Sequence, residues 1–269
     1  MAFLACVAPA SLRVTRAFRR RILRGAALSV PDEHASLTPA FARLLRKAVR
    51  PGSLVADLGT GEGRAALGAA ARMAQRVIGL DRDAAVLEGA RARARELGFR
   101  NVDFRQVDLE QPGLLSRHLR HELGCPQGFD AVLAHLCVSD RILKRAATLV
   151  RRGGWVLVTA LHSDHWYETG LGSRFAYTER ELVQALRSAR LMPLELEIDT
   201  VELKFPSLAV LKDLYLGGER NPRLRAWRQN GRWRRLEERF SAGRRTLTIS
   251  RITALAEPGR RAASVPAGR

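Results

Sequence analysis

Short apolar runs alternate with amphipathic segments through most of the chain. The runs have the length of buried strands, about four to eight residues, and the segments between them repeat apolar residues at helical spacing. Because strands that alternate with helices pair in parallel, this pattern predicts an α/β fold with helices on both faces of a sheet. The predicted strands are 53–58, 76–81, 102–107, 130–136 and 154–161, with helices at 63–74, 83–97, about 113–122 and 139–150.

The flanking segments extend this block. Residues 36–50 are predicted to form a helix, since Thr38 and the proline after it suit a helix start. Residues 178–190 begin with the capping-box sequence TERE and predict another helix. Two late strands at 193–205 and 245–255 fit a closing antiparallel pair. The whole pattern predicts a seven-stranded sheet, mostly parallel, with an antiparallel last strand.

The most informative stretch is LVADLGTGEGR at 54–64. An apolar strand turns through Asp57 into three glycines at alternate positions, Gly59, Gly61 and Gly63. Glycine permits positive φ and lets a ligand approach the backbone closely. A phosphate-binding P-loop would need Gly-Lys-Ser/Thr where this chain has Gly-Arg-Ala, and the dinucleotide fingerprint would need a glycine at position 64, which is arginine. A structural turn without a ligand stays an alternative.

Two further strands end in aspartate. Asp81 lies 22 residues after Gly59, close to the spacing of about 20 at which an acidic residue meets a ribose. The alternative role for Asp81, capping the next helix, suits Asp83 better. Asp108 follows the third predicted strand. Three strands in succession that end in glycines or an acid favour a nucleotide-type ligand at one edge of the sheet.

The pattern D-x-G-x-G-x-G resembles motif I of class I S-adenosylmethionine-dependent methyltransferases. The resemblance covers about residues 36–205, and the stretches 129–136 and 149–162 are most similar to small-molecule (type 11-like) methyltransferases, including those that methylate carboxylates on carrier proteins. It implies a Rossmann-like fold, S-adenosyl-L-methionine as cofactor, ribose contacts from Asp81 and an adenine contact from Asp108. The implied cofactor-binding residues are Asp57, Gly59, Thr60, Gly61, Gly63, Asp81, Arg82, Asp108, Leu109 and His135.

The chain outside this block matches no pattern that we can assign. We predict a basic N-terminal arm at 1–35, the methyltransferase domain at 36–255, and a disordered tail at 256–269. Within the domain, a helical basic insert at about 206–245 separates the last two strands and carries two tryptophans. This position suits acceptor specificity, so we expect the acceptor over the ends of the fourth and fifth strands, beneath the insert.

Methyl transfer requires mainly that the nucleophile be positioned, so the sequence need not contain a conspicuous catalytic residue. The candidates for a base or substrate contact are His135 after the fourth strand, and His162, Asp164 and His165 after the fifth. Two histidines and one aspartate in a turn are a weak metal signal, and no metal is expected. The Asn/Asp-Pro-Pro-aromatic motif of base N-methyltransferases is replaced by AHLC at 134–137, and no Pro-Cys motif suggests cytosine C5-methylation.

Charge is concentrated at the two ends of the chain. Residues 1–50 carry a net charge of +8, residues 51–216 carry +1 and residues 217–269 carry +10. Basic flanks attract nucleic acid, anionic membranes or acidic carrier proteins, although 42 of the 46 basic residues are arginine, as a coding bias would produce. For the N-terminal arm, an organelle transit segment and a basic amphipathic helix at 12–23 are equal alternatives.

No apolar run is long enough for a transmembrane helix, and three cysteines without metal or redox spacing suggest a reduced, cytoplasmic location. The leading hypothesis is a methyltransferase that O- or N-methylates a small-molecule or carrier-bound acceptor. One alternative is an RNA methyltransferase that uses the basic flanks. Another is a methyltransferase-like binding or assembly factor without catalysis.

Overall fold

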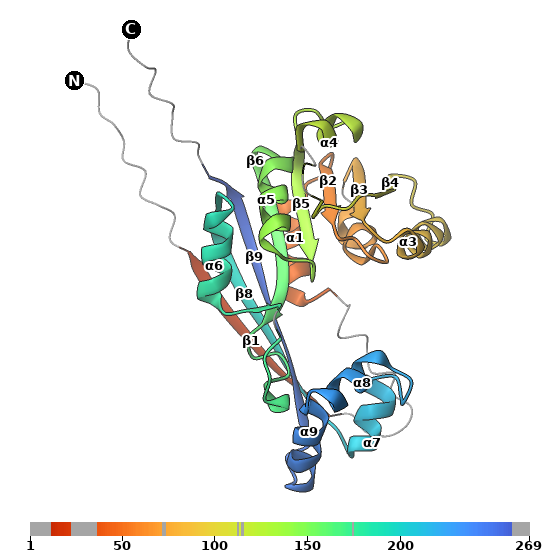
Figure 1. The fold of residues 1–269 in the computed structure, drawn as a ribbon. Helices are drawn as coiled ribbons and strands as arrows, with labels where there is room; N and C mark the ends of the chain where they lie inside the picture. Colours follow the sequence, from red (N-terminus) through yellow and green to blue (C-terminus); the bar gives the residue numbers. More distant parts are fainter. Residues whose placement is uncertain are drawn as a thin grey trace, which may run out of the picture.

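The computed structural model describes residues 12–22, 37–71, 74–111, 113, 116–173 and 175–259. These residues form one nine-stranded sheet in the order β1-β8-β9-β6-β5-β2-β3-β4, with β7 paired to β6 off this path (Figure 1). β9 is antiparallel to β6 and β8, and the other pairs are parallel. The strands are β1 (Arg13–Ile22), β2 (Leu54–Leu58), β3 (Arg76–Asp81), β4 (Val102–Gln106), β5 (Phe129–His135), β6 (Val150–His162), β7 (Ala176–Tyr177), β8 (Leu191–Lys204) and β9 (Thr246–Pro258). The seven predicted strands and the antiparallel last strand are confirmed, and β1 and β7 are additional.

Helices cover both faces of the sheet, as predicted. Successive side chains of a strand point to opposite faces, so Val55 packs with α1 (Pro39–Ala48) and α3 (Ala84–Glu96). Its neighbour Ala56 belongs to the hydrophobic cluster that contains α4 (Ser116–Glu122), α5 (Asp140–Leu149) and α6 (Glu179–Ser188). The two clusters form the layers above and below the central strands and hold the carboxyl ends of those strands in place.

Side-chain caps determine where most of these helices begin. The hydroxyl of Thr38 accepts a hydrogen bond from the Phe41 N–H at 3.1 Å, and Asp83 accepts one from the Ala85 N–H at 2.9 Å. Before α6, Thr178 and Glu181 form the predicted capping box. Each cap satisfies a backbone N–H that the first helical turn leaves without a partner. Such a cap stabilises the fold by about 0.5–2 kcal/mol.

The helix predicted at 63–74 is interrupted. A π-turn, η1 (Ala66–Ala70), replaces its middle, and Gly68 has a non-helical ψ of −133°. A Cβ on Gly68 would lie 3.0 Å from the Cδ1 of Leu37, so this close packing requires glycine. Glycine in a helix interior lowers helix stability by about 1 kcal/mol relative to alanine. The helix is therefore weak at Gly68, and tertiary packing determines the backbone conformation there.

The alternative of a basic amphipathic helix at 12–23 is wrong. Its residues Arg13–Ile22 form β1, which extends the sheet by parallel pairing with β8, from Arg13 opposite Glu195 to Ile22 opposite Lys204. Arg16 of β1 also forms an ion pair with Glu179 at the start of α6. The strand is stabilised by a partner 182 residues further along the sequence, and its own residues carry no clear strand pattern.

The insert between β8 and β9 forms a second, smaller hydrophobic core. It consists of α7 (Leu208–Val210), η3 (Leu211–Tyr215), α8 (Pro222–Gln229) and α9 (Arg232–Ser241), and Figure 1 shows it at the end of the long β8–β9 pair. Trp227 and Trp233 are buried in this core, against the end of β9 and against Trp166. The tryptophans therefore stabilise the insert and do not offer an open apolar surface.

Candidate functional site

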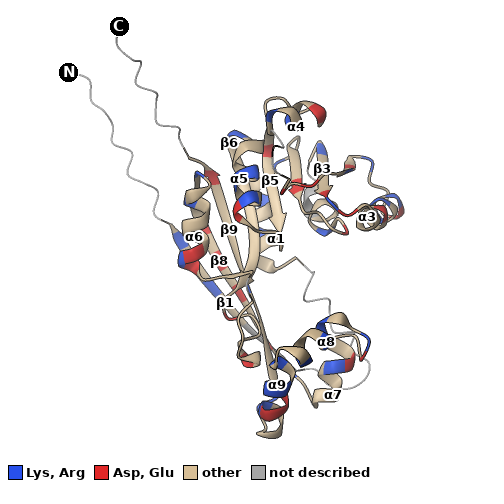
Figure 2. Ribbon diagram, in the orientation of Figure 1, with Lys and Arg blue, Asp and Glu red and all other residues tan. Residues whose placement is uncertain are grey.

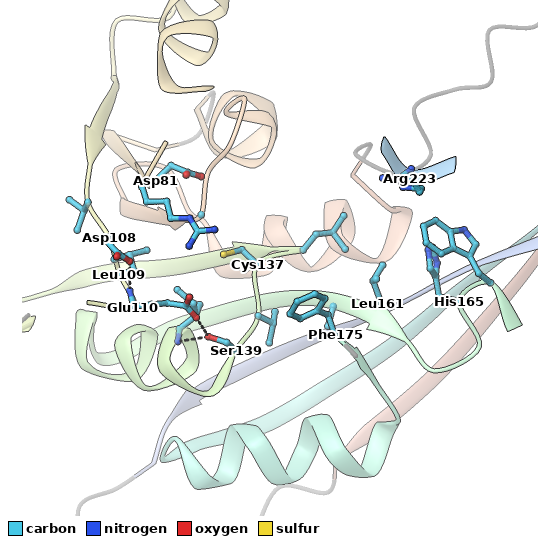
Figure 3. A pocket seen from close by; sticks show the side chains of 18 residues that line it. Asp81, Asp108, Leu109, Glu110, Cys137, Ser139, Leu161, His165, Phe175 and Arg223 are labelled. Carbon is cyan, nitrogen blue, oxygen red and sulfur yellow. Dashed lines mark hydrogen bonds between the residues drawn. The ribbon is translucent and has the colours of Figure 1, made fainter. Parts of the chain in front are cut away.

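A cavity of about 590 Å³ lies where the central strands reach their carboxyl ends. Ligands of open α/β sheets bind at this edge. Figure 3 shows side chains from the ends of β3, β5 and β6, and from the insert, directed toward one another. The lining comprises Gly59, Asp81, Arg82, Val107, Asp108, Leu109, Glu110, Leu136, Cys137, Val138, Ser139, Ile142, Ala160, Leu161, His165, Trp166, Phe175 and Arg223.

The glycine turn forms part of this lining and needs its glycines for two reasons. Gly59, Gly61 and Gly63 have φ of +65°, +52° and +77°, values that a side chain would strain. A Cβ on Gly59 would also lie within 2.5 Å of the Cβ of Cys137, whereas a Cβ on Gly61 would meet no atom within 4 Å. The turn is therefore packed tightly on one side and open on the other.

The predicted acidic residues line the cavity beside this turn. Oδ2 of Asp81 accepts a hydrogen bond from the Gly61 N–H at 2.9 Å, and Oδ1 accepts one from the Asp83 N–H at 3.1 Å. Oδ1 of Asp108 accepts one from the Glu110 N–H at 3.0 Å. A carboxylate offers about four lone-pair positions, so both aspartates keep acceptor capacity for a ligand while the backbone fixes their orientation.

A second cavity of about 410 Å³ adjoins the turn and shares Gly59 and Leu136 with the first. Asp57 and His135 line it, and each has a buried atom, Oδ1 of Asp57 and Nε2 of His135, without a hydrogen-bond partner among the described residues. Thr60 donates a hydrogen bond to the other oxygen of Asp57 at 2.6 Å. Buried polar atoms without partners are uncommon in proteins, so this pair marks a place for a polar ligand.

Burial shifts the pKa values of these two groups in opposite directions. Loss of hydration raises the pKa of Asp57 to about 7, because it disfavours the charged carboxylate. Loss of hydration, together with the nearby charges of Arg251 and Arg64, lowers the pKa of His135 to about 3. His135 is therefore neutral near pH 7. With so low a pKa it is a poor proton acceptor at that pH.

Of the three candidates after the fifth strand, only His165 reaches the cavity. His162 is buried elsewhere, with Nε2 at 3.3 Å from Oε2 of Glu179 and Nδ1 accepting the Asp164 N–H at 3.2 Å. Asp164 is largely exposed and lines neither cavity described above. Nδ1 of His165 accepts a hydrogen bond from the Ser250 N–H at 3.2 Å. Nδ1 of His165 is therefore occupied and carries no proton, so the ring cannot act as a base through that nitrogen.

The remaining predicted residues divide between the two cavities and the core. Arg82 and Leu109 line the larger cavity, and Thr60 and Gly61 line the smaller one. Gly63 lies behind the turn, where a Cβ would meet the ring of Phe104 at 3.0 Å. The structure thus brings together the predicted donor residues, apart from Gly63, around the two adjoining cavities.

Leu136 and Phe175 line the opposite wall of the larger cavity and were missed by sequence reasoning. Leu136 and Trp166 have φ of +57° and +59°, and both line the larger cavity. Positive φ costs a bulky L-residue about 1–2 kcal/mol, so surrounding packing must impose these conformations. Phe175 and Arg223 complete this wall, and Arg223 lies 5.3 Å from the centre of the Trp166 ring. No local sequence signal marks Leu136 or Phe175.

The parallel sheet, its antiparallel β9 and the glycine turn at a strand end define a class I methyltransferase fold. The family described as "Methyltransferase domain" matches residues 50–197, which is more than half of the chain. The chain therefore belongs to this family and is an S-adenosylmethionine-dependent methyltransferase. No curated protein matches the sequence.

Solved structures show the same fold at low sequence identity. A Bacillus halodurans C-125 protein assigned as a methyltransferase is 17% identical, with a TM-score of 0.57 over 83% of this chain and 100% of that chain. The YcgJ protein of Bacillus subtilis is 15% identical, with a TM-score of 0.58 over 82% and 99%. The 4+2 cyclase SpnF is 19% identical, with a TM-score of 0.56 over 86% of each chain. These likenesses establish the fold and leave the acceptor open.

Two general properties of the described residues complete the picture. They contain no group of three or more His, Cys, Asp or Glu side chains arranged to hold a metal ion. Among the helices that the structure describes, none is both long enough and apolar enough to span a membrane.

Proposed function

We propose that the larger cavity binds S-adenosyl-L-methionine beside an acceptor, and that the chain O- or N-methylates a small-molecule or carrier-bound acceptor. The observation that carries this proposal is one continuous lining that includes Asp81 and Asp108 as well as Trp166, Phe175 and Arg223. A ribose and an adenine suit the two aspartates, and an apolar acceptor suits the aromatic wall. Placing both reactants in one cavity can lower the activation barrier by about 7–11 kcal/mol.

The residues present fit the donor. The open side of the turn at Gly61 leaves room for a ligand against the backbone, and the two lone-pair-rich aspartates suit ribose hydroxyls and an adenine amino group. Oδ1 of Asp57, which has no partner among the described residues, suits the ammonium of an amino-acid moiety. When bound, the donor supplies a methyl group on a positively charged sulfur.

The chain's own residues position the acceptor and avoid competing with it. Burial raises the pKa of Cys137 to about 11, so this cavity-lining thiol stays protonated near pH 7 and is a poor nucleophile. His165 lines the same cavity, and the Ser250 N–H holds its Nδ1 in place. This arrangement suits a nucleophile that arrives without a proton, such as a carboxylate, which needs no general base.

RNA is the second candidate acceptor. Lys and Arg recur along β1 and in the helices of the insert (Figure 2), and Arg13 and Arg16 are exposed. Phosphate contacts from such residues would make binding steeply dependent on salt concentration, whereas a buried small-molecule site would respond weakly.

Calorimetry and turnover test these alternatives together. We expect the protein to bind both S-adenosylmethionine and S-adenosylhomocysteine, and to transfer labelled methyl groups into a metabolite extract rather than into RNA. Absence of binding by the folded protein would contradict the proposed donor site. Binding without transfer to either extract would instead favour the role of a binding or assembly factor, and salt-sensitive labelling of RNA would favour the second candidate.

A further inference from the structure

We propose that Arg223 binds an anionic group of the acceptor, so that the enzyme selects amphipathic acceptors that carry a carboxylate or phosphate. This inference rests on the proposed function, because it assigns the acceptor end of the same cavity. It begins from the placement of a single cation in an otherwise apolar part of the lining. Figure 3 shows Arg223 beside His165, on the far side of the cavity from Asp81.

Several side chains of the cavity lining are apolar. Val138, Ile142, Leu161 and Phe175 are among them. Burying apolar ligand surface against such a wall contributes about 25 cal/mol per Å². An acceptor with an extended apolar body therefore fits this part of the cavity better than a fully polar one.

Trp166 supports the guanidinium and is itself immobilised. Its indole N–H donates to the hydroxyl of Tyr215 at 3.0 Å, and its backbone N–H donates to the Thr248 carbonyl at 2.8 Å. Its ring also meets that of Trp227 edge-on, with the centroids 4.9 Å apart. Because the indole N–H is already bonded, Trp166 presents only ring surface to Arg223, and an arginine stacked on a ring keeps its N–H edge free for an anion.

Arg223 is the cation of the insert that lines the larger cavity, and in the part of the chain that the structure describes it has no counterion there. Arg228 pairs with Glu219 at 2.7 Å, and Lys212 pairs with the same carboxylate at 2.8 Å. Arg232 donates to the Gly172 carbonyl at 2.7 Å. Among the described residues no carboxylate lies within ion-pair distance of Arg223, although its backbone is fixed by a hydrogen bond from its N–H to Asn221 at 2.8 Å. A cation that lines a cavity without an internal partner is available to a ligand anion.

The guanidinium matches an oxyanion in shape as well as in charge. Its parallel N–H groups bind carboxylate or phosphate oxygens in pairs, at roughly twice the strength of neutral hydrogen bonds. An anion at Arg223 would anchor one end of the acceptor, with its apolar body along Leu161 and Ile142 and its reacting atom toward the turn at Gly59. Arg223 is thus an acceptor-binding residue, and it takes no part in the transfer of the methyl group.

The test uses the full chain saturated with S-adenosylhomocysteine and three probes of equal chain length: decanoate, decyl phosphate and neutral decanol. Calorimetry should show that the wild-type protein binds at least one anionic probe ten times or more tighter than decanol. Arg223→Gln should lower the affinity for that anionic probe at least tenfold and leave the affinity for decanol within twofold of the wild-type value. Arg223→Lys should retain part of the preference for the anionic probe over decanol. Whichever of decanoate and decyl phosphate binds tighter identifies the oxyanion.

Arg225→Gln is the matched control, because Arg225 is exposed on the same helix and does not line the cavity. It should leave all three affinities within twofold. Equal affinity of the wild type for decanol and both anions, failure of both anions to bind, or an equal loss in Arg225→Gln would overturn the proposal. Failure of S-adenosylhomocysteine to bind would instead count against the donor site, and the probes could still be measured without it.

Discussion

The proposed donor end and the proposed acceptor end of the cavity are built in different ways. The donor end consists of consecutive strand ends, β2, β3 and β4, whose functional residues follow each strand directly in the sequence. The acceptor end joins the loop after β6 to an insert more than 40 residues further along, at the end of the β8–β9 pair. Local motifs therefore specify the donor end, and long-range packing specifies the acceptor end.

The two ends also differ in their cores. The donor end rests on the two large hydrophobic clusters of the sheet, whereas the acceptor end rests on the small cluster of the insert. Insertions at such a position can change without disturbing the sheet, because loops and inserts vary while the scaffold stays constant.

The largest expected effect concerns Asp57 at the donor end. Its pKa is raised from 3.8 to about 7 by burial, so the folded protein holds a proton that the unfolded chain releases above about pH 4. The stability that this group contributes is present below pH 4 and is lost as the pH rises through 7. Between pH 4 and 8 the free energy of unfolding should therefore fall by about 4 kcal/mol more in the wild type than in Asp57→Asn.

Urea denaturation across this pH range measures the difference. Asp164→Asn, which removes a largely exposed carboxylate, is the control for the loss of one charge. Parallel curves for the wild type and Asp57→Asn would mean that burial does not hold the carboxyl group protonated, and that the donor turn tolerates a charge without a ligand.

A smaller effect is expected for the close packing of the glycine turn. Gly59→Ala should lower the free energy of unfolding by about 3 kcal/mol, because it adds overlap with Cys137 to the strain of a positive φ. Gly98→Ala is the matched control, since Gly98 has a φ of +72° and open space around it, and should cost about 1 kcal/mol. Equal losses in denaturation experiments would show that the turn moves away from Cys137 without cost.

Asp81 should affect donor binding rather than folding. Asp81→Ala should weaken the binding of S-adenosylhomocysteine by about 1.5–3 kcal/mol, which is the contribution of a hydrogen bond to a charged acceptor. Asp83→Asn, which keeps a capping side chain on α3, should leave the affinity within twofold. If calorimetry found the same affinity for S-adenosylhomocysteine in Asp81→Ala and the wild type, Asp81 would not be a ribose-binding residue.

Much of the fold was predictable because its determinants are local. The seven strands, the caps at Thr38 and Thr178, and the meeting of Gly59, Asp81 and Asp108 at one cavity all follow from short patterns that the structure reproduces. Each pattern has a direct physical cause, such as an unsatisfied N–H at a helix start or a positive φ in a turn.

The acceptor wall was not predictable because nothing local determines it. Leu136 and Trp166 adopt positive φ against their own preference, and only the surrounding tertiary packing imposes it. Arg223 is one of many arginines in the insert, and the sequence alone could not separate it from its neighbours Arg228 and Arg232, which bond within the insert or to the adjacent loop. The histidines after β6 diverge for the same reason, since only His165 turns toward the cavity.

β1 gives the smallest expected effect and the sharpest separation of the two ends. It pairs with the outer edge of β8, at the opposite end of the strand order from β2, β3 and β4. Deleting residues 1–22 removes this strand and the Arg16–Glu179 ion pair, and none of its described residues, 12–22, lines either cavity described above. The shortened chain should therefore bind S-adenosylhomocysteine within twofold of the wild type by calorimetry, even where its thermal stability is lower. Loss of binding by a shortened chain that retains its native circular dichroism spectrum would mean that the N-terminal segment contributes to the donor pocket, and that the donor end is not specified by the local motifs alone.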